Sequence, residues 1–532
     1  MKRWNGWGEP SIHFALSDSA TLFLENKIGT FTAYPDTAWE TALAGVGEPS
    51  PDLPPHPLVK TDPEGRLLHA RGQSLPDWIA LRSGRIGVFP DGVALPTSSE
   101  EVRALLDHAR QSGVHLIPYG GGTSVVGHIN PLPGGTPVVT VDLSRLNQFL
   151  QLDETSHLAT FGAGVTGPDL ESALRARGYT LGHFPQSFEY STLGGWIAAR
   201  SSGQQSYHYG RIEDLFAGGH VETPAGPLDL LNFPASAAGP DVREMILGSE
   251  GRLGIITEAT VRVRPLPEAE DFYGVFFKDW ESGVRAVRAA AQAELPLSMM
   301  RFSDPDETEA NLALAGTSRL FEYAGRGLSW LVGPERCLLI FAVTGTHRDV
   351  TRTRRQAGSL FRQHGGLPTG TLAGHAWRKN RFLTPYLRNT LWERGVAVDT
   401  LETAVPWSNV LPAAKTIKSA IAEAIAGTGE RALVIAHLSH VYRDGASIYV
   451  TYLFRRTEDP DELLERWQKM KTAASQAITA HGGTISHQHG VGTDHMPFLE
   501  AEKGVLGLEV LRTMSKTFDP QGIMNPGKLI GL

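Results

Sequence analysis

The sequence feature that most constrains the fold is a run of three glycines, Gly120–Gly122, placed directly after the apolar segment VHLIPY. A short apolar segment that meets glycine at once predicts a buried strand ending in a tight loop. Because glycine has no Cβ, the backbone of such a loop can lie against a ligand and direct its N–H groups at anionic oxygens. Thr123 and Ser124 add hydroxyl donors, which favours a phosphate-binding loop over a purely structural turn.

A second stretch, residues 184–215, is rich in small hydrogen-bonding residues. Its middle reads LGGWIAA, which is too apolar for an ordinary polar surface loop. A high density of small donors beside glycine suits a diphosphate and a flat ring that lies against the backbone. A further glycine-rich turn starts at Leu247 and leads into an alternating segment that ends at Pro265, which predicts a long strand.

One glycine pattern lacks the context that its usual function requires. Gly162–Gly167 matches the G-x-G-x-x-G pattern of dinucleotide-binding folds. Such folds also need an acidic residue at the end of the next strand, where it holds the ribose. The next strand signal ends at Pro185 and Gln186 without a carboxylate, and no Lys-Ser or Lys-Thr pair follows. The context therefore disfavours both a Rossmann fold and a P-loop.

Charge and composition disfavour several classes of protein. The 532 residues include 49 Lys and Arg against 57 Asp and Glu, a net charge of −8, which gives no general reason to expect a nucleic-acid partner. The single cysteine, Cys337, excludes an internal disulfide. Apolar runs stay far below the ~18 residues of a membrane span, and the start MKRWNGWGEP lacks the apolar stretch of a secretory signal. We therefore expect a cytoplasmic protein without a transmembrane segment.

Secondary-structure signals divide the chain into four parts. Residues 1–84 are irregular and proline-rich, which predicts a wrapping segment. Residues 85–267 mix helix and strand signals, whereas in 268–480 amphipathic helices alternate with apolar strands such as CLLIFAV and ASIYVTYLF. The latter texture is typical of an α+β domain on an antiparallel sheet. Residues 481–532 carry a His-rich turn, a helix and a Pro/Gly tail.

Five motifs, in this order and spacing, resemble the FAD-binding family of vanillyl-alcohol oxidase and p-cresol methylhydroxylase. They are PYGGGTS, SFEYSTLGGW, YGRIEDL, GSEGRLGIITEATVRVRP and SHQHGVG. Within this family, KRWNGWG near the start and LETAVPW at 401–407 resemble the alkylglycerone-phosphate synthase branch. The resemblance covers nearly the whole chain.

The resemblance implies an α+β fold with FAD as cofactor. Residues 85–267 would form a two-subdomain, PCMH-type FAD-binding domain, 268–480 an α+β cap on an antiparallel sheet, and 481–532 a segment returning to the flavin. Covalent relatives often carry His in the glycine loop, where this chain has Thr123 and Ser124, so we expect non-covalent FAD. The residues implied to line FAD are Pro118, Tyr119, Gly120, Gly121, Gly122, Thr123, Ser124, Gln186, Ser187, Phe188, Glu189, Tyr190, Ser191, Thr192, Ala199, Arg200, Ser201, Ser202, Glu250, Gly251, Arg252, Leu253, Gly254, Ile255, Ile256 and Asn525.

The same resemblance assigns roles to five other residues. His487 and His489 of SHQHGVG would move a proton at the substrate, a task that suits imidazole because its unperturbed pKa is ~6.5. Tyr449 would act as acid and base, although without the family it reads equally well as a core aromatic. Arg388 would grip a substrate phosphate with its guanidinium fork, and Arg301 matches another arginine linked to activity.

Two features leave the chemistry open. In the synthase motif three histidines follow one another, whereas the middle position here is Gln488, which cannot shuttle protons. The tail FDPQGIMNPGKLI resembles instead the D-lactate and glycolate dehydrogenase branch, in which Asn525 would lie near the flavin. His437 and His440, together with the His487 pair, also offer metal ligands. We expect no metal because neither pair contains a carboxylate, but their spatial proximity is open.

The resemblance implies two alternative enzyme functions. The first is exchange of the acyl group of acyl-dihydroxyacetone phosphate for a fatty alcohol through flavin N5, with FAD formally redox-neutral. The second is a dehydrogenase or oxidase that transfers hydride from a 2-hydroxy acid or alcohol to N5. A non-enzymatic flavin carrier is disfavoured because several site-type residues accompany the cofactor loops. We expect a small or lipid-like, phosphorylated substrate, a homodimer and peripheral membrane contact, with apolar stretches near 312–331 and 383–392 lining a lipid tunnel.

Overall fold

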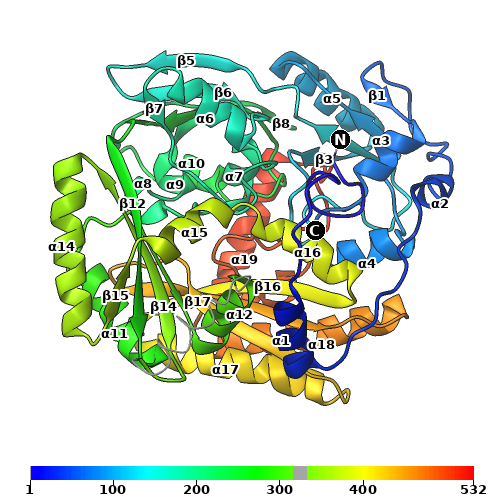
Figure 1. Ribbon diagram of the computed structural model, residues 1–532. Helices are drawn as coiled ribbons and strands as arrows, with labels where there is room; N and C mark the ends of the chain where they lie inside the picture. Colours follow the sequence, from blue (N-terminus) through cyan, green and yellow to red (C-terminus); the bar gives the residue numbers. More distant parts are fainter. Residues whose placement is uncertain (1, 316–331, 532) are drawn as a thin grey trace.

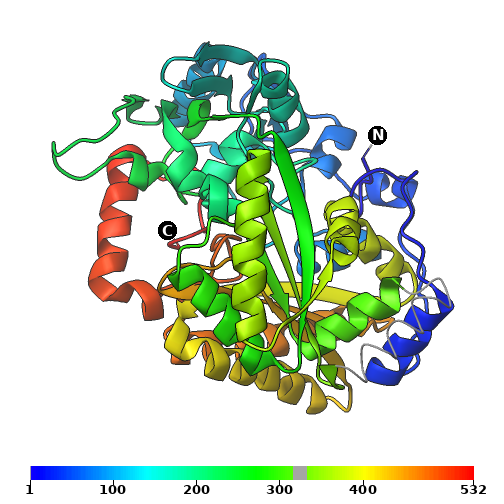
Figure 2. The same cartoon turned by 60° about the vertical axis from the view of Figure 1, so that its left-hand side comes forward.

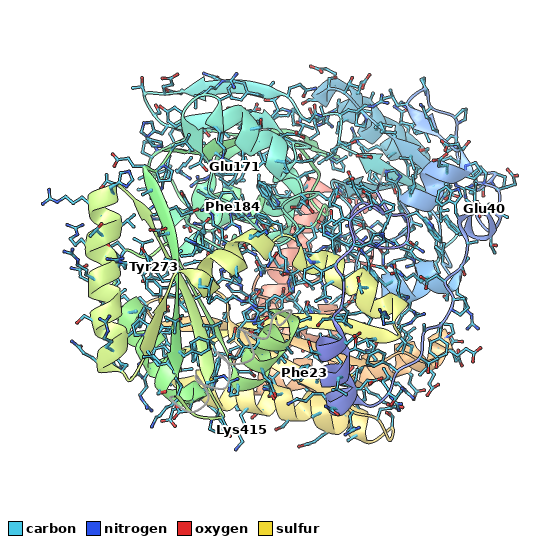
Figure 3. All side chains as sticks on the ribbon, in the orientation of Figure 1. Phe23, Glu40, Glu171, Phe184, Tyr273 and Lys415 are labelled. Atoms are coloured by element: carbon cyan, nitrogen blue, oxygen red, sulfur yellow. The ribbon has the colours of Figure 1, made fainter. Side chains whose placement is uncertain are left out.

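The computed structural model describes residues 2–315 and 332–531. Its elements form two halves (Figure 1). Two small sheets built from residues 59–262 fill the upper half, and one long antiparallel sheet with its helices fills the lower half. Side chains from both halves project into the region between them, where Phe184 of the upper half lies 5.0 Å from the guanidinium of Arg381 (Figure 3). The functional residues lie along this boundary.

The first small sheet ends in the glycine loop. Its order is β1-β2-β4-β3, with β2 and β3 each parallel to β4. The helix α5 (Ser99–Ser112) connects β2 to β3, and the hydroxyl of Ser98 caps it by accepting the Glu101 N–H. The strands are β1 (Val59–Lys60), β2 (Gly92–Ala94), β3 (His115–Tyr119) and β4 (Val138–Asp142). The glycine loop thus follows β3 directly, as the sequence predicts.

The second small sheet is wholly antiparallel, with the order β5-β6-β10-β8-β9. Helices α6 (Gly167–Arg175) and α7 (Leu193–Ala199) lie between its strands in the sequence. Its strands are β5 (Phe149–Asp153), β6 (Leu158–Gly162), β8 (Phe216–Thr223), β9 (Gly226–Leu230) and β10 (Ile255–Arg262). Its own buried cluster, which includes Phe161, Trp196 and Phe216, makes this sheet a separate subdomain.

The lower half is a seven-stranded sheet in which every pairing is antiparallel. In sheet order its strands are β15 (Leu367–Gly370), β12 (Ala269–Phe277), β14 (Cys337–Gly345), β13 (Met299–Ser303), β17 (Ala432–Leu438), β18 (Gly445–Arg455) and β16 (Val396–Pro406). Four helices cover its outer face, and Figure 2 shows one of them, α14, running beside β12 and β14. They are α11 (Trp280–Gln292), α14 (His347–Gln363), α17 (Trp407–Ala426) and α18 (Pro460–Ala480).

Four other helices pack against the seven-stranded sheet, where they contact β12, β16 and β17. They are α1 (Asp18–Ile28), α12 (Pro305–Ala315), α15 (Leu372–Asn380) and α16 (Thr384–Glu393). The N-terminal segment is held to α16 because the Asn389 side chain accepts the Trp7 N–H at 3.1 Å and donates to the Trp7 carbonyl at 2.8 Å. Among residues 2–315 and 332–531, each helix is too short or too polar to cross a lipid bilayer.

The C-terminal residues return to the first sheet. After helix α19 (Leu499–Phe518), the chain runs parallel to β3, with Leu116 bridging to Met524. The Leu116 N–H donates to the Ile523 carbonyl and the Asn525 N–H donates to the Leu116 carbonyl, both at 2.8 Å. These bonds bring Asn525 beside the glycine loop.

The aromatic cluster under the seven-stranded sheet makes its stability testable. Phe302 is fully buried, stacks on Trp280 at 4.8 Å and meets Phe277 edge-on at 5.7 Å. Replacing Phe302 by Ala should cost about 3–5 kcal/mol, because the cavity left in a packed core is only partly filled by relaxation. Urea unfolding followed by tryptophan fluorescence measures this loss. Phe233→Ala, at a position 53% exposed, should change stability by less than about 0.5 kcal/mol, and equal losses would contradict the packing described.

Candidate active site

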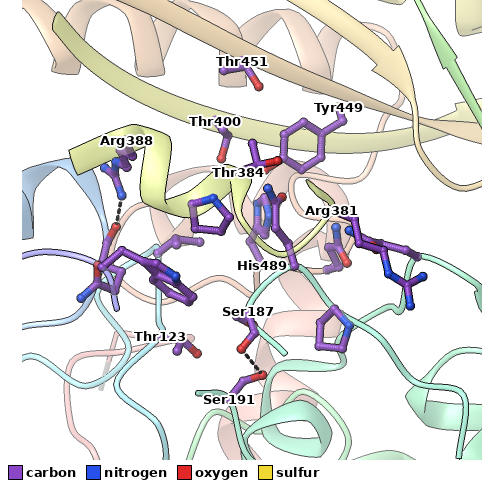
Figure 4. Close-up of a pocket in the computed structure, with 18 of the residues that line it drawn as sticks. Thr123, Ser187, Ser191, Arg381, Thr384, Arg388, Thr400, Tyr449, Thr451 and His489 are labelled. Carbon is purple, nitrogen blue, oxygen red and sulfur yellow. Dashed lines mark hydrogen bonds between the residues drawn. The ribbon is translucent and has the colours of Figure 1, made fainter. Parts of the chain in front are cut away.

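A large cavity of about 1080 Å³ lies between the glycine loop and the inner face of the seven-stranded sheet. Figure 4 shows Ser187, Ser191 and Thr123 on one side, Thr400 and Tyr449 on the other, and His489 between them. Residues from all parts of the chain therefore face one space. Its volume slightly exceeds the range of about 300–1000 Å³ that is common for ligand sites.

The glycine loop and the serine-rich segment lie so close together that the glycine loop has no room for side chains of its own at Gly120 and Gly121. A Cβ added to Gly121 would lie 1.7 Å from the Tyr190 carbonyl oxygen, and one on Gly120 would lie 2.3 Å from Thr192 Oγ1. Thr192 is itself engaged, since its hydroxyl accepts the Gly195 N–H at the start of α7. The two loops can therefore form one continuous wall of backbone only because these positions are glycine.

Most of the residues predicted to bind FAD face the cavity. Those that line it are Pro118, Tyr119, Gly120, Gly121, Gly122, Thr123, Ser124, Gln186, Ser187, Ser191, Thr192, Ala199, Ser201, Glu250, Gly251, Gly254, Ile256 and Asn525. Eight others lie behind this wall: Phe188, Glu189, Tyr190, Arg200, Ser202, Arg252, Leu253 and Ile255. Arg252, for example, is buried and donates to the Met524 carbonyl at 2.6 Å, which ties the returning tail to the glycine-rich turn.

The chemistry of this wall fits FAD. Hydroxyls of Thr123, Ser124 and Ser201 and the backbone of the glycine-rich loops supply donors of the kind that bind a pyrophosphate. The Asn525 amide donates to the carbonyls of His128 and Glu250, at 3.0 and 2.7 Å, while its buried Oδ1 has no partner among the described residues. An acceptor is thus left for a ligand in the cavity.

The opposite wall is sorted by strand register. His437, Tyr449 and Glu402 are directly paired across β17, β18 and β16, so their side chains share one face. Two residues along, the paired row is Ile435, Thr451 and Thr400, and the next is Leu433, Leu453 and Val398. The sheet face therefore changes from ionisable to apolar over four residues of each strand.

Arg301 forms a tight cluster at the polar end. Its guanidinium donates to His437 Nε2 at 2.7 Å and to Glu307 Oε1 at 2.6 Å. Burial opposes ionisation of Glu307, but the Arg301 charge and His437 hold the pKa of this carboxyl well below its usual range. Burial and Arg301 together lower the pKa of His437 against the pull of Glu307. The predicted Arg301 is therefore fixed by two residues for which the sequence suggested no such role.

Tyr449 and His489 face the cavity in uncharged forms. Tyr449 stacks on His437 at 4.8 Å, and its ring lies edge-on to His489 at 5.7 Å. Burial raises the pKa of Tyr449 to about 12, and burial lowers the pKa of His489 to about 4 despite the nearby Glu402 charge. At neutral pH His489 can accept a proton and Tyr449 can donate one.

His487, by contrast, points away from the cavity into a buried polar cluster. Its Nε2 lies 2.6 Å from the Tyr442 hydroxyl and 3.2 Å from Arg211 Nη1, and its ring stacks on His440 at 4.9 Å. Its Nδ1 lies 3.4 Å from Glu402 Oε1. The predicted contact of His487 with substrate therefore has no counterpart in this arrangement, in which His489 lines the cavity.

The same cluster is a candidate metal-ligand set. Ligand atoms of Glu402, His440 and His487 lie within 4.8 Å of one another, and all three residues are buried. Sequence spacing could not reveal this set because Glu402 comes from another strand. The Arg211 guanidinium also contacts His487, so the cluster already contains a positive charge that attracts the carboxylate.

Arg388 offers unused hydrogen-bond donors to the cavity. Its Nη1 donates to the Gln73 carbonyl at 2.6 Å, and its guanidinium lies 4.2 Å from the Trp78 ring. The buried Nε and Nη2 atoms have no partner among the described residues. Burial lowers the pKa of Arg388 to about 10, so the side chain stays cationic at neutral pH. An anionic group in the cavity would complete its bonding.

The remaining wall is apolar. It lies at the end of the cavity where the apolar row of the sheet, Leu433, Leu453 and Val398, is placed. It is built from Phe23 and Leu24 of α1, Leu312 and Leu314 of α12, and Leu387 and Leu391 of α16. The predicted tunnel-lining stretches near 312–331 and 383–392 thus both contribute, although residues 316–331 lie outside the described part of the chain.

Two important residues, Glu307 and Glu402, were missed in the sequence. Glu402 lies within LETAVPW, where a charged residue interrupts an alternating apolar strand opposite another such strand. A carboxylate on the buried face of a predicted strand was the available signal. Glu307 carried no comparable signal, because it occurs in an ordinary acidic first turn of a helix.

The fold and the site are those of an FAD-dependent enzyme. Residues 90–228 match the family model described as FAD binding domain, and residues 266–529 match that of FAD linked oxidases, C-terminal domain. The chain belongs to the FAD-linked oxidase family with a PCMH-type fold. The predicted family and α+β architecture are thereby confirmed.

Individual relatives refine this assignment. The chain is 33% identical to alkyldihydroxyacetonephosphate synthase of Dictyostelium discoideum, covering 98% of this chain and 85% of the relative. A solved alkyldihydroxyacetonephosphate synthase structure has a TM-score of 0.85 at 30% identity, with 99% of each chain covered. Glycolate oxidase subunit GlcD of Bacillus subtilis is 25% identical over 83% of this chain and 89% of the relative. A p-cresol methylhydroxylase structure shares the fold alone, with TM-score 0.66 at 14% identity over 88% of this chain and 93% of that chain.

The contact at Gly121 predicts a specific loss of cofactor. Gly121→Ala should separate the two loops, since its Cβ would overlap the Tyr190 carbonyl, and purified protein should contain little FAD. Gly135→Ala is the matched control, because a Cβ there would meet nothing within 4 Å. The ratio of flavin absorbance to protein absorbance measures the outcome. Full FAD content in the Gly121 variant would contradict this account of the site.

The mode of FAD attachment is a separate prediction. Because the glycine loop carries Thr123 and Ser124 rather than His, acid precipitation should release all flavin into the supernatant. Flavin that stays with the pellet, and with a peptide after proteolysis, would show a covalent bond and refute this expectation.

Proposed function

We propose that this protein exchanges the acyl group of an acyl-dihydroxyacetone phosphate for a fatty alcohol, giving an alkyl ether and a free fatty acid. The observation that carries the proposal is Arg388. Two of its buried donors have no partner in the described part of the chain, and the cavity that it lines also has a long apolar wall. A phosphate and an aliphatic chain are the two groups that such a combination would bind. Full-length similarity to alkyldihydroxyacetonephosphate synthases supports the same reaction.

Arg388, the apolar wall, His489 and Tyr449 each have a role in this reaction. Arg388 binds the phosphate through Nε and Nη2, and the apolar wall holds the aliphatic chains. Neutral His489 accepts the proton that leaves the reacting carbon, and Tyr449 donates to the departing carboxylate oxygen. Bound FAD would supply the electrophilic centre of the exchange. His487 lies outside the cavity, behind the sheet wall, and positions Glu402 and Tyr442 by direct contact.

A second function is favoured by particular observations. Asn525 lines the cavity with an unpaired oxygen, and it belongs to the tail that resembles hydroxy-acid dehydrogenases. The similarity to a glycolate oxidase subunit points the same way. In that reaction His489 would take the hydroxyl proton of a 2-hydroxy acid or alcohol while hydride leaves for the flavin. Anaerobic bleaching of the flavin by such a substrate would support this second function.

The primary proposal is tested with ¹⁴C-labelled hexadecanol and palmitoyl-dihydroxyacetone phosphate. Wild-type holoenzyme should incorporate the label into an ether that resists alkaline hydrolysis. Arg388→Lys should raise KM for the phosphorylated substrate by about tenfold or more, because a point charge replaces a bidentate fork. Arg378→Lys, on the exposed side of α15, is the control and should leave KM unchanged. Absence of labelled ether from wild-type holoenzyme would refute the proposal.

A further inference from the structure

Gln488 faces the cavity from the His-rich turn, and one hydrogen bond fixes its amide. The Gln488 Nε2 donates to Glu402 Oε2 at 2.6 Å, and the half-buried side chain lines the cavity beside His489. An ordinary glutamine can turn its amide by 180° and exchange donor for acceptor. Whether Gln488 can do so depends on whether Glu402 can donate a hydrogen bond or can only accept one.

Glu402 can only accept hydrogen bonds. It is 1% exposed, and its carboxylate also accepts from the Ser439 hydroxyl while His487 Nδ1 lies 3.4 Å away. Its Oε1 accepts from Ser439 and its Oε2 accepts from the Gln488 amide, so both carboxylate oxygens are already acceptors in this arrangement. A flipped Gln488 would set two oxygens against each other.

The amide orientation leaves a single group for the ligand. With Nε2 held by Glu402, Oε1 has no hydrogen-bond donor among residues 2–315 and 332–531. Oε1 is therefore an acceptor without a donor in the described part of the chain. It lies near His489 and Tyr449, which face the cavity in neutral form. An acceptor that lines the cavity in this way is available to a hydrogen-bond donor on the ligand.

The strand register indicates which donor arrives there. Glu402 and Val398 are four residues apart on β16, roughly 13 Å at about 3.3 Å per residue. The apolar row consists of Leu433, Leu453 and Val398 and runs across the strands. An aliphatic chain that contacts this row and extends in the strand direction brings its end to the row of Glu402. For a fatty alcohol, that end is a hydroxyl.

We propose that Gln488, held in one orientation by Glu402, is the residue that recognises the hydroxyl hydrogen of the incoming alcohol. Its Oε1 accepts that hydrogen bond and so holds the alcohol oxygen in one position in the cavity. The inference deepens the function proposed above and names the chain's own determinant for an alcohol. Glutamine thus contributes as a fixed acceptor at a position where it cannot carry a proton.

Binding to the holoenzyme tests the proposal without catalysis. Isothermal titration calorimetry compares 1-octanol with 1-methoxyoctane, which has the same chain and oxygen but no hydroxyl hydrogen. Wild-type holoenzyme should prefer octanol by about tenfold, the effect of one buried hydrogen bond. Gln488→Leu should abolish the preference. Glu402→Gln should reduce it, because the new amide accepts either orientation of Gln488.

Controls separate recognition from folding and from the reaction itself. Gln468→Leu, at an exposed position on α18, should keep the wild-type preference, and all variants should keep their FAD content. In turnover, Gln488→Leu should raise KM for the alcohol more than KM for the phosphorylated ester. Equal binding of the two probes by wild type, or an unchanged preference in Gln488→Leu, would overturn the inference. Failure of the proposed reaction would appear separately, as octanol preference without any ether product.

Discussion

The close contact between the glycine loop and the serine-rich segment is the constraint on which the site depends. At Gly121 the neighbouring backbone comes so close that any Cβ would overlap the Tyr190 carbonyl. This contact joins two subdomains with separate cores into one wall. The C-terminal tail reinforces the wall, because Asn525 bonds to carbonyls from both sides of it. A flat, donor-rich surface results, which suits a long dinucleotide cofactor.

The other wall obtains its properties from register instead of loops. Pairing across β17, β18 and β16 aligns His437, Tyr449 and Glu402, and the same pairing aligns the apolar row at the other end. A one-residue slip would turn both rows to the opposite face. Reactive groups and lipid-compatible surface are thus positioned by the same set of backbone hydrogen bonds. The helices behind the sheet, with buried residues such as Ile417, hold that register in place.

Local patterns in the sequence were sufficient for the family, the fold and most of the cofactor wall. The glycine run at 120–122 and the small donors near Thr192 act through backbone geometry, which neighbouring residues largely determine. Contacts between side chains far apart in the sequence could not be predicted from local patterns. Glu402 meets Gln488 only because β16 packs beside the His-rich turn, and Glu307 meets Arg301 only because α12 folds back over β13. His487 and His489 are two positions apart, yet only the surrounding structure shows that one lines the cavity while the other contacts Tyr442.

The grip of Asn389 on Trp7 has a practical consequence. Asn389 follows Arg388 on α16, and its two hydrogen bonds to the Trp7 backbone tie the beginning of the chain to the helix that carries this arginine. The first residues therefore act as a brace for a binding group almost four hundred positions downstream. An affinity tag or fusion partner attached ahead of Lys2 would pull on the segment that braces α16, and its effect would reach the end of the cavity where Arg388 lies. Comparing tagged and cleaved preparations is accordingly part of handling this enzyme well.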